Sequence, residues 1–399
     1  MPEEPSTAAD IEVAQVREAV KDLIHPKYDT YFNILRWIQG TNHNVPKAIH
    51  MLRKHLKWRK EKRLDTDSST LQSCKIASDH APLCIIKPTN PDADHILVVD
   101  QAGKIDVGGV LKSVQPTDYI HQKYRNIEKI LSILMEMEAR LGRQCYAYYI
   151  FDLDGLSFDP TMVGTVTGPF RISWELMAMH YREWIDKFIV INAPGFMNIL
   201  WSAISPFIPE DGRGKIVFPG KSWRDDLQEL LGKESLPEKY GGTLKDSEVL
   251  TAPEPVPKEK YWSPKVGEPN HTNLHKISIP ASKERQLLYP VKAGEKLIFY
   301  TQNDSELMYG IAFTTNKDLP EEDWDILVPP CPRAGLPAID AGHFEPMDNG
   351  YYQLRIQNQA AWLFPSTFKI LALSESGKEI FAENQGAEKW FKAGQKFKK

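Results

Sequence analysis

The chain has 399 residues, of which 42% are hydrophobic and 26% are charged, as is usual for a soluble globular protein. At this length two domains are expected. The formal net charge of −4 gives no electrostatic reason to expect nucleic-acid binding. The four cysteines (Cys74, Cys84, Cys145 and Cys331) show neither CxxC pairing nor histidines at metal-ligand spacing, so they indicate neither a zinc site nor a disulfide framework.

Signals for membrane insertion or secretion are not evident in the sequence. The first residues, MPEEPSTAADIE, are acidic and lack the apolar core of a signal peptide. A run of about 18 apolar residues, which a membrane-spanning helix requires, does not occur. We therefore expect a cytoplasmic protein.

Residues 1–75 have the pattern of a helical subdomain. Residues 31–38 are rich in apolar side chains, and Pro46 suits the first turn of a second helix. The basic run KHLKWRKEKR (residues 54–63) has two interpretations, a nucleic-acid or membrane surface and the solvated face of a helix. We favour the solvated face, with Leu56 and Trp58 packed beneath it.

Residues 76–245 have the pattern of an α/β domain. Short, continuous apolar runs predict strands that are buried on both faces, at residues 96–99, 146–151, 188–191 and 216–218. Between them, apolar residues from Ile120 to Leu141 recur every three or four positions, which predicts a long amphipathic helix. Strands that alternate with helices predict a mostly parallel sheet.

The remainder of the chain changes character twice. Residues 246–270 contain five prolines and are predicted to form an extended, semi-rigid linker. In residues 271–375 short segments alternate apolar and polar side chains, which predicts an antiparallel β-sandwich or jelly roll. The tail, residues 376–399, mixes lysines with aromatic residues; it suits either an anionic membrane surface or a solubilising extension.

The most informative stretch of the α/β domain is residues 187–242. A buried strand ends in the turn Asn192–Gly195, and a short segment with large apolar side chains on most of its circumference follows. Such a segment is either buried or faces something apolar other than protein. We interpret it as the cover of a lipid cavity, and its residues are Phe196, Leu200, Trp201, Ile204, Phe207 and Ile208.

Two motifs that suggest catalysis are better explained otherwise. The segment GKIVFPGKS (residues 214–222) has five residues between its glycines, whereas a phosphate-binding loop has four, and part of it reads as a strand. Asp152 and Asp154 follow a buried strand, where ligands gather in α/β sheets, but Asp-Gly is also a common turn signal. We interpret these two carboxylates as turn or capping residues, with a role in a polar pocket as the second alternative.

Glu183 and Lys215 stand close to two neighbouring strands of the predicted sheet. Glu183 precedes the strand at 188–191, and Lys215 begins the next strand. A carboxylate and an ammonium group there could bind the hydroxyls and phosphate of a lipid head group. They could equally form a surface ion pair, which contributes about 0–1 kcal/mol.

The motifs of residues 187–242, namely INAP, PFI, GRGKIVFPG and LPEKYGGTL, resemble the CRAL-TRIO (Sec-fourteen-type) lipid-exchange domain. Upstream, YFNILRWIQG and IHMLRKHLKWRK are similar to the N-terminal helices of that family, and NGYYQLRIQN and FPSTFKILAL are similar to a GOLD domain. This pairing of domains is that of the supernatant protein factor (tocopherol-associated protein) family. The resemblance covers residues 15–245 and 270–375.

The resemblance implies a lipid cavity closed by a mobile gate helix, which here falls on Phe196 to Ile208. Members that bind phosphatidylinositol use a glutamate and a lysine that match Glu183 and Lys215. The sequence departs from them at two places: Thr41 and Asn42 replace an arginine-lysine pair, and Gly212 replaces a threonine. Two ligand classes therefore stay open, phosphatidylinositol and a more apolar lipid such as tocopherol, squalene or a sterol.

The resulting prediction is a lipid-binding or lipid-transfer protein without catalytic residues, metal or cofactor apart from the bound lipid. Its expected partners are the lipid, a transient membrane surface such as that of the Golgi, and a protein that docks on the GOLD-like domain. The alternative is a lipid-sensing adaptor in Golgi or endosomal membrane traffic.

Overall fold

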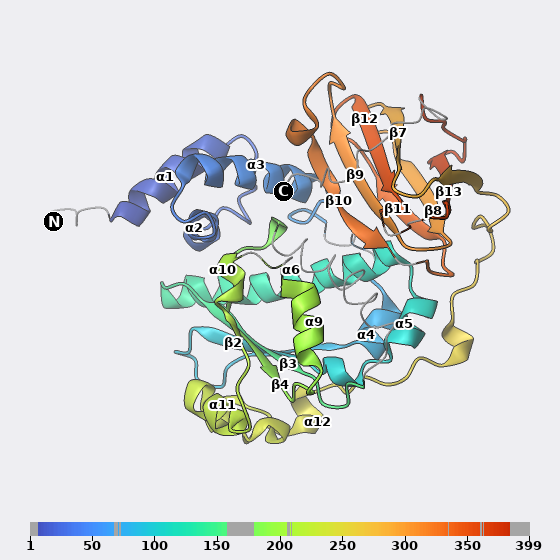
Figure 1. Cartoon of the computed structure of the whole chain (residues 1–399). Helices are drawn as coiled ribbons and strands as arrows, with labels where there is room; N and C mark the ends of the chain where they lie inside the picture. Colours follow the sequence, from blue (N-terminus) through green and yellow to red (C-terminus); the bar gives the residue numbers. More distant parts are fainter. Residues whose placement is uncertain are drawn as a thin grey trace. The chain divides into compact units, whose positions relative to one another are not determined.

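The computed structural model describes residues 7–67, 71, 73–157, 179–205, 208, 210–333, 335–359, 361 and 363–383 (Figure 1). The described residues fall into two compact units. The first contains those between 1 and 107, 121 and 158, and 177 and 255; the second contains those between 108 and 120 and from 256 onward. Within the described ranges, no helix combines the length and the apolar character needed to cross a membrane.

The chain begins with three helices that share one core. They are α1 (Ala8–Val20), α2 (Tyr31–Gln39) and α3 (Val45–Glu61). Each begins at a side chain that accepts a backbone N–H of the first turn, namely Thr7, Thr30 and Asn44. The core is built from apolar residues at helical spacing: Val13, Val16, Val20, Ile34, Trp37, Ile38, Leu52 and Leu56. Leu56 and Trp58 are both buried, as predicted. The basic run is not solvated throughout, because Arg59 is only 4% exposed and pairs with Asp65 and Glu128.

The first unit also contains a five-stranded sheet with the order β1-β2-β3-β4-β5. Its strands are β1 (Leu83–Ile86), β2 (His95–Asp100), β3 (Tyr146–Asp152), β4 (Ile185–Ile191) and β5 (Ile216–Val217). The pairs from β2 to β5 are parallel and β1 is antiparallel to β2, which confirms the predicted α/β class. The last strand is shorter than its apolar run predicts, because only two of its residues pair with β4.

The helices among these strands are α4 (Lys75–His80), α5 (Val107–Ser113), α6 (Pro116–Leu141), α9 (Met197–Ile204), α10 (Glu210–Arg213), α11 (Trp223–Leu231) and α12 (Asp246–Val249). Figure 1 shows α11 on one side of the sheet and α6 on the other. The face toward α11 is closed by an apolar layer made of Cys84, Ile86, Leu97, Val99, Ile150, Ile189, Ile191, Trp223, Leu227 and Leu231. One face of the sheet is therefore an ordinary protein core.

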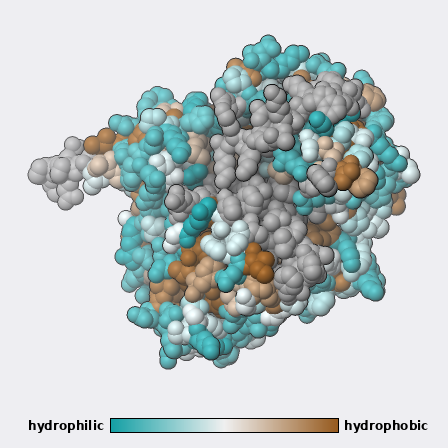
Figure 2. Space-filling model, in the orientation of Figure 1, coloured by the Kyte–Doolittle hydropathy of each residue, from teal (hydrophilic) through white to brown (hydrophobic). Residues whose placement is uncertain are grey.

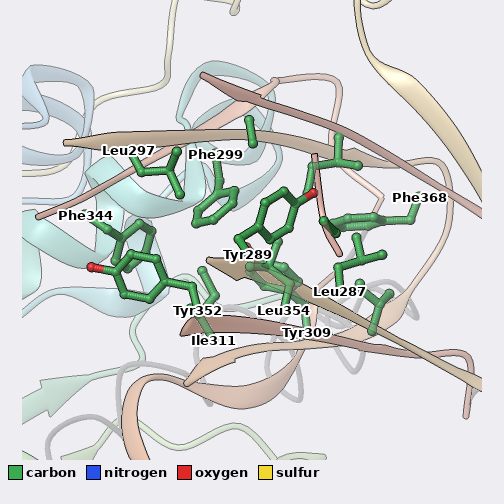
Figure 3. Close-up of a cluster of buried hydrophobic side chains, with 14 of the residues drawn as sticks. Leu287, Tyr289, Leu297, Phe299, Tyr309, Ile311, Phe344, Tyr352, Leu354 and Phe368 are labelled. Atoms are coloured by element: carbon green, nitrogen blue, oxygen red, sulfur yellow. The ribbon is translucent and has the colours of Figure 1, made fainter. Parts of the chain in front are cut away.

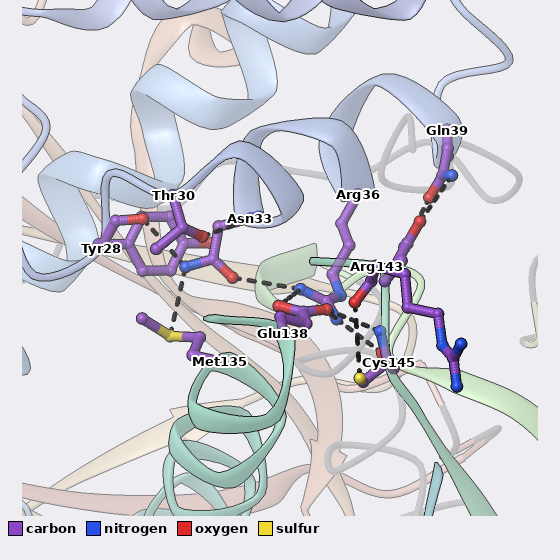
Figure 4. A network of polar contacts seen from close by, with 10 residues as sticks. Tyr28, Thr30, Asn33, Arg36, Gln39, Met135, Glu138, Arg143 and Cys145 are labelled. Carbon is purple, nitrogen blue, oxygen red and sulfur yellow. Dashed lines mark hydrogen bonds and ion pairs between the residues drawn. The ribbon is translucent and has the colours of Figure 1, made fainter. Parts of the chain in front are cut away.

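A buried ion pair joins α2 to α6 and to the start of β3 (Figure 4). The guanidinium of Arg36 binds the carboxylate of Glu138, and both side chains are at most 3% exposed. Arg36 Nη2 also donates to the carbonyl oxygen of Cys145 at 2.8 Å, and the Cys145 N–H donates to Glu138 Oε1 at 2.9 Å. Because the two charges satisfy each other and the nearby backbone, the helical subdomain is fixed to the sheet by polar as well as apolar contacts.

The second unit is an antiparallel β-sandwich, as predicted. Its two sheets have the orders β10-β9-β12-β7 and β11-β8-β13-β6. The strands are β6 (His275–Ile279), β7 (Glu284–Val291), β8 (Leu297–Asn303), β9 (Leu307–Thr314), β10 (Asp325–Arg333), β11 (Asp340–Phe344), β12 (Gly350–Gln357) and β13 (Ser366–Ser374). Large aromatic side chains from both sheets fill the space between them, including Tyr289, Phe299, Tyr352 and Phe368 (Figure 3).

The first ten residues of the proline-rich stretch pack on the α/β unit. Asp246–Val249 form the short helix α12, and Val249 and Leu250 lie against the core beside α11. The carbonyl oxygen of Glu254 lies 2.8 Å from His80 Nδ1 of α4. From Val256 onward the chain belongs to the second unit. Of the predicted tail, residues 384–399 lie outside the described part of the chain.

Candidate lipid-binding site

The sheet face opposite α11 carries aromatic side chains. Strand alternation places Tyr149 and Phe151 of β3 on this face, together with Phe188 and Val190 of β4, their partners in the parallel register. The rings of Tyr149 and Phe188 stack at a centroid distance of 4.7 Å, and Phe151 lies 5.5 Å from Phe188. Tyr149 and Phe151 are only half-buried. This face therefore presents an apolar, aromatic wall.

One polar group is built into that wall. Asp100, the last residue of β2, lies on the same face and accepts a hydrogen bond from the Tyr149 hydroxyl at 2.9 Å. Burial raises the pKa of the Asp100 carboxyl above its ordinary value, although the ammonium group of Lys123 on α6 opposes the shift. The wall thus offers a buried oxygen next to aromatic rings.

Glu183 and Lys215 come together although they are 32 positions apart in the sequence. Lys215 Nζ donates to Glu183 Oε2 at 2.6 Å and to the carbonyl oxygen of Ile185 at 2.9 Å. The lysine and glutamate side chains are 29% and 22% exposed. Glu183 has a φ of 51°, in the left-handed region that a residue with a Cβ seldom adopts. The pair is therefore partly accessible to a ligand and held in a constrained geometry.

The positions that depart from the phosphatidylinositol-binding pattern have local structural roles. Thr41 is buried, and its hydroxyl donates to backbone carbonyls at the end of α2, those of Trp37 and Ile38, both at 3.0 Å. Asn42 is exposed and adopts a left-handed φ of 52° in the turn that follows. Gly212 has no side chain to offer a head group, and no steric requirement for glycine is evident, since a Cβ there would make only an ordinary contact with Ile208 at 3.5 Å.

The predicted gate forms the short helix α9, which follows Phe196. Ile199 is 57% exposed, and Trp201 is half-buried with its ring 5.2 Å from Phe218. Figure 2 shows hydrophobic surface in the region that α9 occupies in Figure 1. Ile208 is buried. The side chains of Leu200 and Ile204, and the whole of Phe207, lie outside the described residues.

The turn that leads into α9 is held by a buried carboxylate. Asn192, directly after β4, has a left-handed φ of 52°, and its side-chain amide donates to Asp152 Oδ1 at 2.7 Å. Asp152 Oδ2 also accepts from Lys239 Nζ at 2.7 Å and from the Tyr240 hydroxyl at 3.0 Å. Asp152 is 1% exposed, and hydrogen bonds from Lys239 and Asn192 outweigh burial, so the pKa of its carboxyl is lowered. The carboxylate thus stays charged and links the ends of β3 and β4 to residues 239–240.

The FDLDG motif (residues 151–155) forms a turn, in agreement with its interpretation from the sequence. The Asp154 N–H donates to Asp152 Oδ1 at 3.0 Å, which is the geometry of an aspartate turn. Sequence analysis did not find Lys239 and Tyr240, although both belong to the LPEKYGG motif. The last glycine of that motif, Gly242, is required by space, because a Cβ there would lie 1.9 Å from the Leu236 carbonyl oxygen.

A buried histidine pair joins α3 to the residues before β4. His55 Nδ1 lies 3.4 Å from His180 Nδ1, and His180 stacks on Trp58 at 4.0 Å. Burial lowers the pKa of His180 to about 3, with a further contribution from the Arg59 guanidinium, and burial likewise lowers the pKa of His55. Both rings are therefore neutral in the folded protein near neutral pH.

This pair predicts acid sensitivity. The unfolded chain binds a proton at His180 below a pH of about 6.5, whereas the folded chain does not. The free energy of unfolding should therefore decrease as the pH is lowered. We expect His180 to contribute a loss of about 2 kcal/mol in the free energy of unfolding between about pH 7 and about pH 5. Urea unfolding of the His180→Phe variant should show a weaker pH dependence. His50→Gln, at an exposed position of α3, is the control, and an equal change in both variants would contradict the assignment.

Comparison with known proteins agrees with this organisation. The CRAL/TRIO domain profile matches residues 83–242, a domain of unknown function (DUF8435) matches residues 6–67, and the F28H7.8-like C-terminal domain matches residues 260–381. The chain is 48% identical over 395 residues to the CRAL-TRIO domain-containing protein F28H7.8 of Caenorhabditis elegans, covering 98% of this chain and 96% of that one. Similarity to a GOLD domain stays a prediction.

More distant proteins are similar to part of this chain. Protein real-time of Aedes aegypti is 25% identical over 330 residues, which are 78% of this chain and 48% of that protein. The crystal structure of Sfh5 superposes with a TM-score of 0.49 and 15% identity, over 63% of this chain and 94% of that chain.

Fold and site together define a two-unit protein in which a mixed α/β unit presents an aromatic sheet face beside an apolar helix, and a β-sandwich follows. The chain belongs to the family of CRAL-TRIO domain-containing proteins, whose domain binds and transfers small lipophilic ligands.

Proposed function

We propose that the protein holds one hydrophobic ligand against the aromatic face of its sheet and exchanges it at a membrane by movement of α9. The observation that carries this proposal is α9 itself. Its sequence, MNILWSAI, contains no charged residue, yet Ile199 is 57% exposed. An apolar helix that is incompletely covered by protein suits a cover that faces a lipid on one side and a bilayer on the other.

The surroundings of α9 support the membrane contact. Val217 ends β5, the strand that pairs with β4, and Phe218 follows it. They are 37% and 43% exposed, and the ring of Phe218 lies 5.2 Å from that of Trp201. Exposed aromatic and aliphatic groups of this kind partition into the boundary between head groups and acyl chains. The proposed movement begins at Asn192, where the left-handed backbone conformation separates the strand from the helix.

The polar groups beside the site favour a ligand with little or no charge. The positive charge of Lys215 is already balanced by Glu183, and neither Thr41 nor Gly212 offers a cation to a phosphate. Taking a phosphate out of water without additional positive charge is costly. A tocopherol, squalene or a sterol therefore fits the proposed site better than phosphatidylinositol does, and no step of this function requires covalent chemistry.

Mass spectrometry of lipid extracted from the purified protein is the experiment that tests the function. The proposal predicts one hydrophobic molecule per protein and exchange of that molecule between vesicles. Protein that carries no lipid and transfers none would contradict it and would favour an adaptor in membrane traffic.

Substitution of Lys215 with alanine distinguishes phosphatidylinositol from an apolar lipid as the ligand, because only phosphatidylinositol has a phosphate that the ammonium group could bind. Since a hydrogen bond to a charged group contributes about 1.5–3 kcal/mol, we expect at least about tenfold weaker phosphatidylinositol binding and little change for an apolar ligand. Vesicle transfer assays with each labelled lipid measure both effects. Lys221→Ala, at an exposed position six residues away, is the matched control. Equal loss of both ligands would show that Lys215 supports the fold rather than the head group.

A further inference from the structure

Asp100 is a buried carboxyl group in an otherwise aromatic wall. The residue is 4% exposed and ends β2, in register with Phe151 of β3. The Tyr149 hydroxyl donates to its Oδ2 at 2.9 Å, and the ammonium group of Lys123 interacts with it electrostatically. Removing a carboxyl group from water is costly unless hydrogen bonds and charges compensate for it. One hydrogen bond is a small compensation, so the presence of this group in the wall calls for an explanation.

The second oxygen of Asp100 is available to a ligand. Within the part of the chain that the structure describes, Oδ1 accepts no hydrogen bond, whereas Oδ2 accepts the one from Tyr149. Oδ1 is also not one of the fully enclosed polar atoms without a partner, which include Nε2 of His180. Each carboxylate oxygen can accept about two hydrogen bonds. Asp100 therefore has unused acceptor capacity at a point that another atom can reach.

The position of Asp100 in the sheet suits the polar end of a bound lipid. Asp100 pairs with Phe151, and Phe151 pairs with Val190 of β4, so all three lie near the carboxyl ends of parallel strands. Ligands of α/β sheets gather at this edge. Asn192, which starts the turn into α9, is two residues beyond Val190. A lipid on the wall therefore places its hydrocarbon part against the aromatic rings and its polar end at the edge from which α9 starts.

The charges around Oδ1 determine the chemical class of that polar end. An acceptor requires a donor, which a pure hydrocarbon lacks, and the negative charge of Asp100 repels a phosphate or a fatty-acid carboxylate. The positive charge of Lys123 disfavours an amine. We propose that Asp100 Oδ1 accepts a hydrogen bond from the hydroxyl group of an otherwise apolar lipid and thereby selects a lipid alcohol over a hydrocarbon. This inference rests on the proposed carrier function and specifies its ligand.

Pairs of lipids that differ in one hydroxyl group test the role of Asp100 in the full chain. The pairs are cholesterol with 5-cholestene, and α-tocopherol with its methyl ether. Competition against the radiolabelled alcohol of each pair gives the relative affinities. Because a hydrogen bond to a charged acceptor changes affinity at least about tenfold, we expect the wild type to prefer the alcohol by that factor in any pair that it binds.

Variants assign this preference to the carboxyl group. Asp100→Leu should bind the alcohol and its analogue equally, whereas Asp100→Asn keeps an acceptor oxygen and should retain part of the preference. Tyr149→Phe removes the hydroxyl that orients the carboxyl group and should reduce the preference. Asp92→Leu removes an exposed carboxylate shortly before β2 and should behave like the wild type. Circular dichroism verifies folding; if Asp100→Leu does not fold, the Asp100→Asn and Tyr149→Phe variants decide.

The failure of this inference and the failure of the carrier function give different results. Equal affinity of the wild type for both members of each pair that it binds would overturn the role of Asp100 and leave the carrier function intact. A preference that every folded variant retains in full would do the same. Wild-type protein that binds none of the four lipids and carries no extracted lipid would contradict the carrier function itself.

Discussion

Replacement of Glu138 with alanine is expected to lower the free energy of unfolding by about 3–5 kcal/mol, because it leaves the Arg36 guanidinium buried without its counter-charge. Both side chains are at most 3% exposed, so water cannot replace the lost carboxylate without opening the contact between α2 and α6. The Cys145 N–H loses its acceptor as well. Urea unfolding followed by circular dichroism measures the effect.

Two control variants show whether the loss comes from the unpaired charge. The double replacement Arg36→Met/Glu138→Leu removes both charges and should recover much of the stability, since a buried pair is often no better than apolar residues of similar size. Glu248→Ala breaks an ion pair with Lys245 whose side chains are 69% and 66% exposed, and such pairs contribute about 0–1 kcal/mol. A Glu138→Ala protein as stable as the Glu248→Ala protein would contradict the interpretation.

Replacement of Asp152 with alanine is expected to reduce stability by about 2–4 kcal/mol and to slow ligand exchange. The substitution removes the acceptor of Asn192, Lys239 and Tyr240 together, and a buried donor left without a partner costs about 1–3 kcal/mol. It also frees the turn that leads into α9, so the helix no longer starts from a defined position. Urea unfolding and vesicle-to-vesicle transfer of the extracted lipid measure the two effects.

The Asn192→Gly variant tests the turn at Asn192 as the hinge for movement of α9. It separates the contribution of this turn from that of the Asp152–Lys239 ion pair. Glycine adopts a φ of 52° without steric cost, so this variant removes the hydrogen bond to Asp152 and leaves the Asp152–Lys239 pair in place. We expect a stability loss of about 1 kcal/mol with altered transfer kinetics. Normal transfer in both variants would contradict the role of this turn as a hinge.

The secondary structure was largely predictable, because it follows from local patterns. Apolar residues at intervals of three and four between Ile120 and Leu141 correspond to α6, and the continuous apolar run before Asn192 corresponds to β4. The end of the sheet was less predictable: residues 216–218 have the same apolar character, yet only Ile216 and Val217 pair with β4. The expected burial on both faces was also wrong for this run, because Val217 and Phe218 are 37% and 43% exposed at the edge of the sheet. The length and burial of an edge strand depend on its neighbours as well as on its own residues.

The candidate site was only partly predictable. Glu183 and Lys215 could be named as charges near the ends of neighbouring strands, but their 2.6 Å contact depends on the alignment of β4 with β5. Lys239 could not be recognised as the partner of Asp152, because the two are 87 positions apart in the sequence and no local pattern relates them.

The sequence by itself determined the order and type of the elements, the apolar character of α9 and the division into an α/β part and a β-sandwich, since each of these is encoded within a few consecutive turns or strands. Only the tertiary structure decided which sheet face is covered by α11 and which carries the aromatic wall, and which charges are paired. The physical reason is that burial and electrostatic pairing depend on distances between segments far apart in the chain, which are defined only when the strands take their register.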